Sequence, residues 1–466
     1  MPALMVQGVS SDAGKSFIAT GLCRWLSRQG ISVAPFKAQN MSNNARVVDG
    51  GEIGSAQWLQ ALAAGVTPDV RMNPILLKPE SDRRSQVVLD GKVDVALTEQ
   101  PWRGRSRQLW PHVVAAYESL ARDYDVIVIE GAGSPAETNL WQDDIVNMAV
   151  AELADAPVLL VVDIDRGGAF AHLYGTWALL PPEHQQRIKG FILNKFRGDP
   201  ALLDPAPRDL EARCGVATIG VVPWIAHDVP DEEGPTLVES PTSGPRVGIV
   251  CGPYASNLDE FVGLQRSAQV RFVRSADEFE AFDLVILPGS KHVAADVQWL
   301  RDEGLEEKLR VSATARTPIL GICGGLQMLG RRVDAVDGVE GSADGLDLLA
   351  VATTLEREKQ TNDVTLVFST MAPPWSWLND QRVVGYEIHH GVTTPLASLS
   401  MSDQRLFFGV ENVLGVYFHG LFENASVLEA FAGRPGGDRE TAFELLADTI
   451  ERHVDASVLR ACLGFE

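Results

Sequence analysis

One of the five cysteines, Cys323, stands in a sequence that suits a nucleophile. The segment at 318–330 reads PILGICGGLQMLG, which is an apolar run, a glycine-flanked cysteine and an amphipathic stretch. Glycines at Gly321 and Gly325 allow the sharp strand-to-helix turn that holds a reactive side chain above a sheet. The N-terminus of the following helix favours the thiolate, which is the reactive form. The pattern therefore predicts nucleophilic catalysis by Cys323.

A thiol nucleophile needs a general base and an oxyanion hole. We expect the base to be His419, which follows the apolar run GVYF. We expect the oxyanion hole to use the backbone N–H of Gly324 together with an N–H near Gly289, in the sequence LPGS. His389 and His390, in GYEIHHG, are alternative bases. Their position in the sequence favours another role, in which they line the pocket or simply end a strand.

A second chemical motif, GVSSDAGKS at 8–16, follows an apolar run and precedes an amphipathic stretch. This strand, loop and helix context is typical of a phosphate-binding loop, in which N–H groups at a helix N-terminus bind phosphate. We expect Lys15 to reach the transferring phosphoryl group and the Ser16 hydroxyl to bind Mg²⁺. The loop is longer than the standard motif, because Gly14 comes six residues after Gly8. The predicted nucleotide-binding residues are Gly8, Ser11, Asp12, Ala13, Gly14, Lys15, Ser16 and Asn194.

Two of the polar residues follow apolar runs that read as buried strands. Glu130 ends the run DVIVIE, where a Mg²⁺ ligand or a group that orients water belongs. Asn194 follows the run at 190–193 and occupies the place of a base-reading Asn-Lys pair in related nucleotide-binding folds. A turn residue after a strand is the competing interpretation of Asn194. The expected cofactors are therefore ATP and Mg²⁺.

Parallel sheets are needed to position these residues. Apolar β-rich runs alternate with amphipathic stretches in the first half, which predicts an α/β domain with a mainly parallel sheet. Ligands of such sheets lie at the carboxyl ends of the strands. A stretch rich in acidic residues, proline and glycine then separates this first domain from a second βα series, which starts at Arg246. We therefore expect an ATP-binding domain at 1–225, a linker at 226–245 and a second domain at 246–466, with an amphipathic helix at 441–462.

Composition limits the partners of the chain. Its 466 residues are enough for two hydrophobic cores. The formal charge of −22 repels nucleic-acid backbones. Because long apolar runs and a signal peptide are not found, we expect a cytoplasmic protein without a membrane segment. Scattered cysteines without a C-x-x-C pair suggest neither disulfides nor a zinc site. The expected partners are small molecules, and the oligomeric state stays open.

The second half is similar to the class I glutamine amidotransferases, which have a flavodoxin-like fold and release ammonia from glutamine through a thioester. One position departs from that family. Class I domains carry a glutamate two residues after the histidine, and here that position is Leu421. Either another acid, such as Glu387 or Glu423, orients His419, or the site works as a dyad. The cobalamin-pathway branch also lacks this glutamate, so the departure indicates a subfamily.

The first half resembles dethiobiotin synthetase and its relatives, P-loop NTPases in which the nucleotide phosphorylates a carboxylate. The longer loop carries this resemblance, as does Ser10, which stands where partitioning ATPases have a lysine. The resemblance implies that Lys37, at the end of the second predicted strand, stabilises the charge that develops on the acyl phosphate. An ordinary surface lysine at a strand end is the alternative.

Both halves together resemble the cobyric acid synthase family. The resemblance implies an ATP- and glutamine-dependent ligase that amidates the b, d, e and g carboxylates of the corrinoid adenosylcobyrinic acid a,c-diamide. The product would be adenosylcobyric acid, on the route to vitamin B12. The runs that carry the resemblance are VAPFKAQNMSNN at 33–44, GGEIG at 50–54, RMNPILLKP at 71–79, EGAGSPAE at 130–137, DIDRGG at 163–168 and NKFRG at 194–198.

The same resemblance implies particular roles for residues of the first half. Ser16, Glu52 and Glu130 would bind Mg²⁺. Asp144, Asn147 and Arg166 would face the acyl phosphate or the corrinoid carboxylates together with Lys37. Solvated loop charge is the competing interpretation of these positions.

Three alternatives are weighed against this interpretation. Cobyrinic acid a,c-diamide synthase shares both domains, but its usual KxGPDY stretch is replaced here by KAQNM at 37–41. In a lipid II amidating ligase the two activities lie on separate chains. A nucleotide switch with a vestigial second domain is opposed by Ser10 and by the retained Cys323 and His419.

Overall fold

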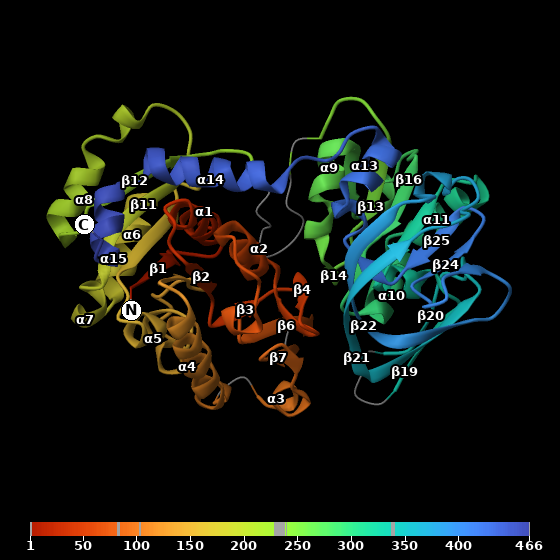
Figure 1. The fold of residues 1–466 in the computed structure, drawn as a ribbon, viewed down its shortest axis with the longest axis horizontal. Coiled ribbons are helices and arrows are strands. Elements are labelled where there is room, and N and C mark those ends of the chain that lie inside the picture. Colours follow the sequence, from red (N-terminus) through yellow and green to blue (C-terminus); the bar gives the residue numbers. More distant parts are fainter. Residues whose placement is uncertain are drawn as a thin grey trace.

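The computed structural model describes residues 2–81, 84–101, 104–227, 238, 240–336 and 341–465. The chain folds into two lobes, and both termini lie in the same lobe (Figure 1). Most of the expected linker, residues 228–237 and 239, lies outside the described residues. No helix in the described ranges is long and apolar enough to cross a membrane.

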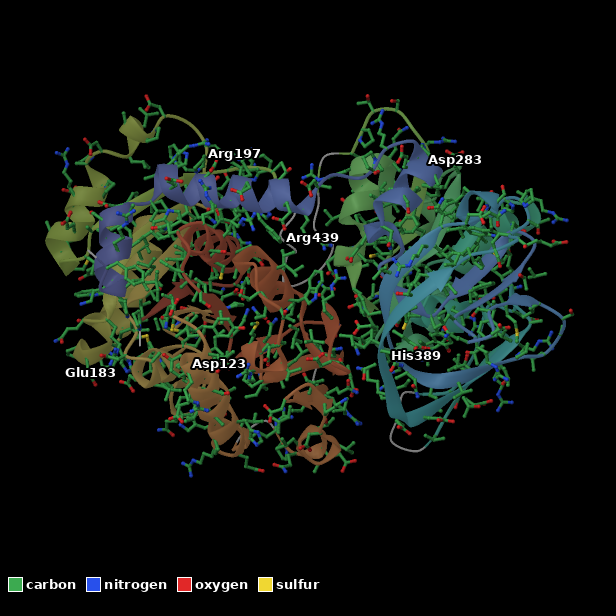
Figure 2. The ribbon with its side chains drawn as sticks, viewed as in Figure 1. Asp123, Glu183, Arg197, Asp283, His389 and Arg439 are labelled. Carbon is green, nitrogen blue, oxygen red and sulfur yellow. The ribbon has the colours of Figure 1, made fainter. Side chains whose placement is uncertain are left out.

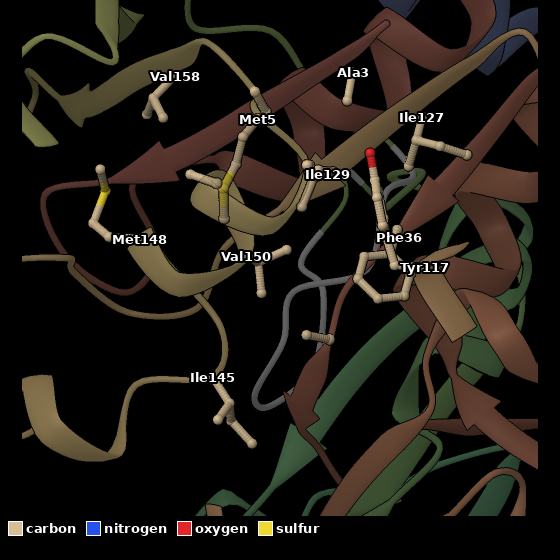
Figure 3. Close-up of a cluster of buried hydrophobic side chains, with 14 of the residues drawn as sticks. Ala3, Met5, Phe36, Tyr117, Ile127, Ile129, Ile145, Met148, Val150 and Val158 are labelled. Carbon is tan, nitrogen blue, oxygen red and sulfur yellow. The ribbon is translucent and has the colours of Figure 1, made fainter. Parts of the chain in front are cut away.

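The first lobe is built on a six-stranded parallel sheet in the order β12-β11-β10-β1-β9-β2. Its inner strands are buried because helices cover both faces. On one face Phe36 meets the ring of Tyr117 at 5.7 Å, beside Met5 and Ile129 (Figure 3). The elements are β1 (Ala3–Gly8), α1 (Lys15–Ser27), β2 (Val33–Phe36), α2 (Ser55–Ala64), α4 (Arg105–Asp123), β9 (Val126–Glu130), α5 (Met148–Leu153), β10 (Val158–Asp163), α6 (Ala169–Leu179), α7 (Pro182–Gln185), β11 (Ile188–Phe196), α8 (Ala206–Cys214) and β12 (Thr218–Pro223).

Two small sheets extend the first lobe toward the second. Strands β3 (Gln39–Met41), β6 (Ile75–Ser81), β7 (Arg84–Leu89) and β8 (Lys92–Val93) form one, followed by α3 (Val95–Glu99). The hairpin β4 (Ala45–Val48) and β5 (Gly51–Gly54) forms the other. Side chains of both sheets share an apolar cluster with the second lobe, so the lobes are packed against each other. The buried members are Ala45, Val47, Leu76, Val88, Tyr386 and Ile388.

The second lobe contains a seven-stranded sheet in the order β15-β13-β16-β18-β25-β24-β23. The first five strands are parallel, and their order is that of a flavodoxin-like fold, as expected from the sequence. A five-stranded sheet, β20-β19-β21-β22-β26, lies in the same lobe. The elements are β13 (Arg246–Val250), β14 (Ala255–Ser256), α9 (Val262–Ser267), β15 (Gln269–Val273), β16 (Leu284–Leu287), β17 (Gly289–Ser290), α10 (Val293–Asp302), α11 (Leu305–Thr314), β18 (Ile319–Ile322), α12 (Gly324–Leu329), β19 (Arg332–Ala335), β20 (Ala343–Asp344), β21 (Val351–Val367), β22 (Arg382–Pro395), β23 (Ser400–Met401), β24 (Phe407–Val410), β25 (Val413–Val416), β26 (Phe418–His419) and α13 (Ala425–Ala432).

The last two helices, α14 (Arg439–His453) and α15 (Ala456–Leu463), return to the first lobe and lie beside its sheet (Figure 1). Leu446 and Ile450 of α14 are buried in the same core as Leu22 of α1. The expected domain boundary is therefore wrong at its C-terminal end, because these helices pack on the first lobe and not on the second. The single helix expected at 441–462 is also wrong, because the structure has the two helices α14 and α15 there. An amphipathic pattern shows that one helix face is buried, but not which core buries it.

Candidate active site

Cys323 lies on the sharp turn that the sequence predicts. It follows β18 and precedes α12, with φ 53° and ψ −105°, a conformation that non-glycine residues seldom adopt. Gly325 is needed beside it, because an added Cβ would lie 2.0 Å from the carbonyl oxygen of Leu287. The Cys323 side chain is almost completely buried, with a residue exposure of 7%. The fold thus holds the thiol in one strained, enclosed position.

The predicted base, His419, lies at the same place and is completely enclosed. Its Nδ1 is 2.8 Å from the Oε1 of Glu260, whose second oxygen accepts a hydrogen bond from the N–H of Gly420 at 2.8 Å. Burial lowers the pKa of His419, but the carboxylate of Glu260 and the sulfur of Cys323 outweigh burial and raise this pKa to about 10. This raised pKa favours the protonated ring at neutral pH, which suits a histidine that pairs with a cysteine nucleophile.

The acid beside His419 is Glu260, which differs from the two examples named from the sequence, Glu387 and Glu423, and from the alternative of a dyad. Glu387 instead meets the Nε2 of His389 at 2.7 Å, and Glu423 pairs with Arg46 at 2.6 Å. Glu260 stands 159 positions from its partner, so no local pattern marks it.

The two alternative bases have other partners. The ring of His389 stacks on Tyr417, with centroids 3.8 Å apart. The Nδ1 of His390 is 3.0 Å from the backbone oxygen of Glu356. Burial and then Lys359 lower the pKa of His390 to about 3. Among the described contacts, Cys323 meets the backbone oxygen of Ile388 and the side chain of His419, but neither of these two rings.

The two glycines predicted for the oxyanion hole lie beside this pair. Strand β17, which begins at Gly289, lies directly against the cysteine turn. A Cβ added to Gly324 would therefore lie only 2.6 Å from the backbone nitrogen of Ser290. A Cβ added to Gly289 would lie 3.0 Å from the Cε1 of His419. Both backbone segments are therefore close enough to the predicted nucleophile and base to bind an oxyanion.

The phosphate loop joins β1 to α1, as predicted, with Gly14 in the left-handed region at φ 96°. The Ser16 hydroxyl donates to the Oε1 of Glu130 at 2.9 Å, and the Nζ of Lys37 lies 2.8 Å from the same oxygen. Gln60, which the sequence pattern does not mark, donates to the Oε2 of Glu130 at 2.5 Å. A hydroxyl and a carboxylate at a phosphate loop are the hard oxygen ligands that Mg²⁺ prefers, so Ser16 and Glu130 fit this ion.

Asn194 and Arg166 both contact the phosphate loop. The amide of Asn194 donates to the backbone oxygen of Ala13 at 3.0 Å. Arg166 pairs with Asp12 at 3.2 Å and with Asp163 at 3.3 Å, and its side chain is 55% exposed. The amide of Asn194 therefore also holds the loop, and its expected contact with the nucleotide stays a prediction.

Asp144 and Asn147 shape the segment that follows Glu130. One oxygen of Asp144 accepts from the backbone N–H groups of Val146 and Asn147, at 2.8 and 2.9 Å. The Asn147 side chain accepts from the N–H of Ala132 at 3.2 Å and donates to its carbonyl oxygen at 2.7 Å. Asn147 thus holds the backbone two residues after the predicted Mg²⁺ ligand, and Asp144 holds the turn that carries Asn147; their expected contacts with substrate stay predictions.

Glu52 does not join the predicted Mg²⁺ ligands. One carboxylate oxygen pairs with Lys359 of the second lobe at 2.6 Å, and the other pairs with Lys78. Burial raises the pKa of Glu52, but Lys359 and Lys78 outweigh burial and hold it well below its usual range. The described contacts of Glu52 lead to these lysines and not to Ser16 or Glu130. We therefore correct the expected Mg²⁺ ligands to Ser16 and Glu130.

A nucleotide-binding lobe joined to a flavodoxin-like lobe with a Cys-His-Glu arrangement defines a glutamine-hydrolysing amidotransferase ligase. Family models agree: residues 4–233 match the CobQ/CobB/MinD/ParA nucleotide binding domain, and residues 246–427 match the CobB/CobQ-like glutamine amidotransferase domain.

Relatives match over nearly the whole chain. A cobyric acid synthase of Variovorax paradoxus (strain S110) is 50% identical over 474 residues, which is 99% of each chain. One of Polaromonas sp. (strain JS666 / ATCC BAA-500) is 47% identical, covering 99% of this chain and 98% of the relative. The solved structure of PurLQS from Thermotoga maritima aligns with 45% of this chain and 100% of that one, at 16% identity and a TM-score of 0.32. The chain belongs to the cobyric acid synthase family.

Proposed function

We propose that this chain converts the b, d, e and g carboxylates of adenosylcobyrinic acid a,c-diamide into amides, with ATP as activator and glutamine as nitrogen source. The observation that carries the proposal is that one chain holds both chemical sites. Cys323, His419 and Glu260 form one, and Ser16, Glu130 and Lys37 lie at the other. The identity to cobyric acid synthases over nearly the full length supports the choice of substrate.

In the second lobe, the thiolate of Cys323 attacks the side-chain amide carbon of glutamine. The N–H groups of Gly324 and Gly289 stabilise the oxygen that becomes negative. His419 gives its proton to the departing nitrogen, so ammonia leaves and a thioester remains. His419, now neutral, then takes a proton from water, which attacks the thioester and releases glutamate. Glu260 stabilises the ring in the steps in which it is protonated and holds its orientation throughout the cycle.

In the first lobe, an oxygen of the substrate carboxylate attacks the γ-phosphoryl group of ATP and ADP leaves, which makes an acyl phosphate. Lys15 and Lys37 stabilise the charge on the transferring group. Ser16 and Glu130 would hold Mg²⁺, which would supply positive charge against the phosphates. Ammonia then attacks the acyl carbon, and phosphate leaves. Arg166, Asp144 and Asn147 face the acyl phosphate or the corrinoid carboxylates, and Asn194 contacts the nucleotide. The contacts of Arg166 with Asp12 and of Asn194 with Ala13, both in the phosphate loop, support these roles.

The test is ATP-dependent amidation of adenosylcobyrinic acid a,c-diamide, followed by mass spectrometry with glutamine or with ammonium. Wild-type protein should give four mass steps with either nitrogen source, one for each proposed carboxylate. The Cys323→Ala variant should give them with ammonium only. A parallel reaction with cobyrinic acid separates this activity from that of an a,c-diamide synthase. If the wild type hydrolyses ATP and glutamine but leaves the a,c-diamide unchanged, the substrate is wrong.

A further inference from the structure

Strand β4 of the nucleotide-binding lobe is bonded to the turn that carries Glu260. The N–H of Ala45 donates to the side-chain oxygen of Asn257 at 3.0 Å. The side-chain oxygen of Asn44, one residue earlier, accepts from the N–H of Leu258 at 3.3 Å. The residue that follows Ala45, Arg46, forms an ion pair with Asp259, which precedes Glu260 in the chain. Three consecutive residues of this lobe therefore hold the turn.

Arg46 is buried at this contact, with a residue exposure of 4%. Besides Asp259, its guanidinium pairs with Glu423 at 2.6 Å. Burial lowers the pKa of Arg46, but Asp259 and Glu423 outweigh burial and raise it well above its usual range. Loss of this cation would leave the buried Asp259 carboxylate without its arginine and directly next to Glu260. Because an uncompensated buried charge is costly, the turn would have to move.

The same turn and one neighbouring ring surround His419. Asn257 places its amide nitrogen 3.3 Å from the Nε2 of His419, and Glu260 bonds the Nδ1. The ring of Tyr386 stacks on the imidazole, with centroids 5.2 Å apart and an angle of 20°. Arg46 lies 5.1 Å from the centroid of that same tyrosine ring. Contacts of His419 therefore lead back to strand β4 through Asn257, through Asp259 and through Tyr386.

We propose that Arg46, a residue of the nucleotide-binding lobe, is a positioning residue of the glutaminase site. By holding Asp259 and Tyr386 it keeps Glu260 against His419, so glutamine is hydrolysed at full rate only when the two lobes are docked. The lobe that consumes ammonia thus completes the site that makes it. The proposal rests on the glutaminase activity of the family and not on the corrinoid substrate.

The test compares Arg46→Gln with Arg439→Gln. Arg439 lies between the lobes (Figure 2), at 3.5 Å from Glu423, but it has no described contact with Asp259 or Tyr386. Glutaminase kinetics are measured with glutamine alone. Arg46→Gln should lower kcat about 100-fold, as expected for a misplaced catalytic group, with an unchanged KM for glutamine. Arg46→Lys should recover part of this loss, and Arg439→Gln should behave as wild type.

A second readout separates positioning from folding. The pH profile of glutamine hydrolysis reports the pKa of His419, which Glu260, Cys323 and Tyr386 face, and Arg46→Gln should shift its alkaline limb to lower pH. ATP hydrolysis and ammonium-dependent amidation should be retained. Asp259→Asn, which removes the partner charge at similar volume, should reproduce the loss of kcat. A wild-type kcat and pH profile in Arg46→Gln would overturn the proposal, as would equal losses of glutaminase and ATP hydrolysis in both Arg46→Gln and Asp259→Asn.

Discussion

Replacing Glu260 with glutamine should shift His419 toward its neutral form at neutral pH and strongly slow glutamine hydrolysis. The pKa of about 10 lies about 3.5 above the ordinary value, which corresponds to about 5 kcal/mol in favour of the imidazolium. Burial acts in the opposite direction and is the largest single influence on this pKa. Without the carboxylate, only the sulfur of Cys323 still opposes burial, so we expect the pKa of His419 to fall toward its ordinary value of about 6.5 or below it. Glutamine keeps the size of the side chain, so the fold should survive.

Loss of the imidazolium removes both the partner of the thiolate and the proton donor for ammonia. We expect glutaminase kcat in Glu260→Gln to fall roughly 100- to 10,000-fold, the usual range for general acid–base catalysis. Alkylation of Cys323 by iodoacetamide should slow at neutral pH, since less thiolate is present. The pKa of the His419 ring, measured by NMR titration, should move from near 10 in the wild type toward or below 6.5 in the variant. Ammonium-dependent amidation should continue.

The same substitution predicts a change in stability with pH. Because folding raises the pKa of His419, its contribution is fully present below about 6.5 and is lost as pH rises toward 10. The free energy of unfolding should therefore fall between these pH values in the wild type more than in Glu260→Gln, as measured in urea. Glu387→Gln and Glu423→Gln are the matched controls. If Glu260→Gln keeps the wild-type kcat and ring pKa while a control loses them, the assignment of Glu260 is refuted.

Three further predictions concern the first lobe. Ser16→Ala should weaken Mg²⁺-dependent ATP hydrolysis while glutamine hydrolysis by Cys323 continues; loss of both activities would contradict the separation of the two sites. Glu52→Gln leaves two buried lysines without their carboxylate and should destabilise the protein by about 3–5 kcal/mol in urea unfolding. Its Mg²⁺ requirement should match that of the wild type, and a raised requirement would restore Glu52 as a ligand. Ile450→Ala should lower the free energy of unfolding by about 2–5 kcal/mol, because it leaves a cavity beside α1. If α14 belongs to the nucleotide-binding core, ATP with Mg²⁺ should raise the unfolding midpoint of this variant. A variant as stable as the wild type would contradict that packing.

Local sequence patterns predicted the two chemical motifs and the sheets beneath them. The cysteine turn and the phosphate loop are each a strand, a turn and a helix in direct succession, so their glycines and apolar runs mark them within a few residues. The βα series of the second lobe also predicted parallel strands, because such strands need crossover connections that are visible in the sequence, whereas the flavodoxin-like strand order was implied by the family resemblance.

Tertiary structure alone decided how these motifs are completed. Glu260 reaches His419 across 159 positions, and Gln60 reaches Glu130 across 70. The sequence motif around Glu52 predicted a metal ligand, but in the structure Glu52 pairs with two lysines. One of these lysines belongs to the other lobe. These pairings produce no periodic pattern in the sequence. The partner of a buried carboxylate depends on which residues lie near it in the folded chain.

The docking of α14 follows the same reasoning. Its sequence requires a buried face, and either core could provide one. The choice was made by complementary partners on α1: an apolar surface around Leu22, and Arg24, which bonds Glu444 across 420 positions. The sequence by itself determined which local elements form and which groups could react. Contacts between distant residues decided which acid, lysine or helix stands beside them, because those contacts exist only once the chain has folded.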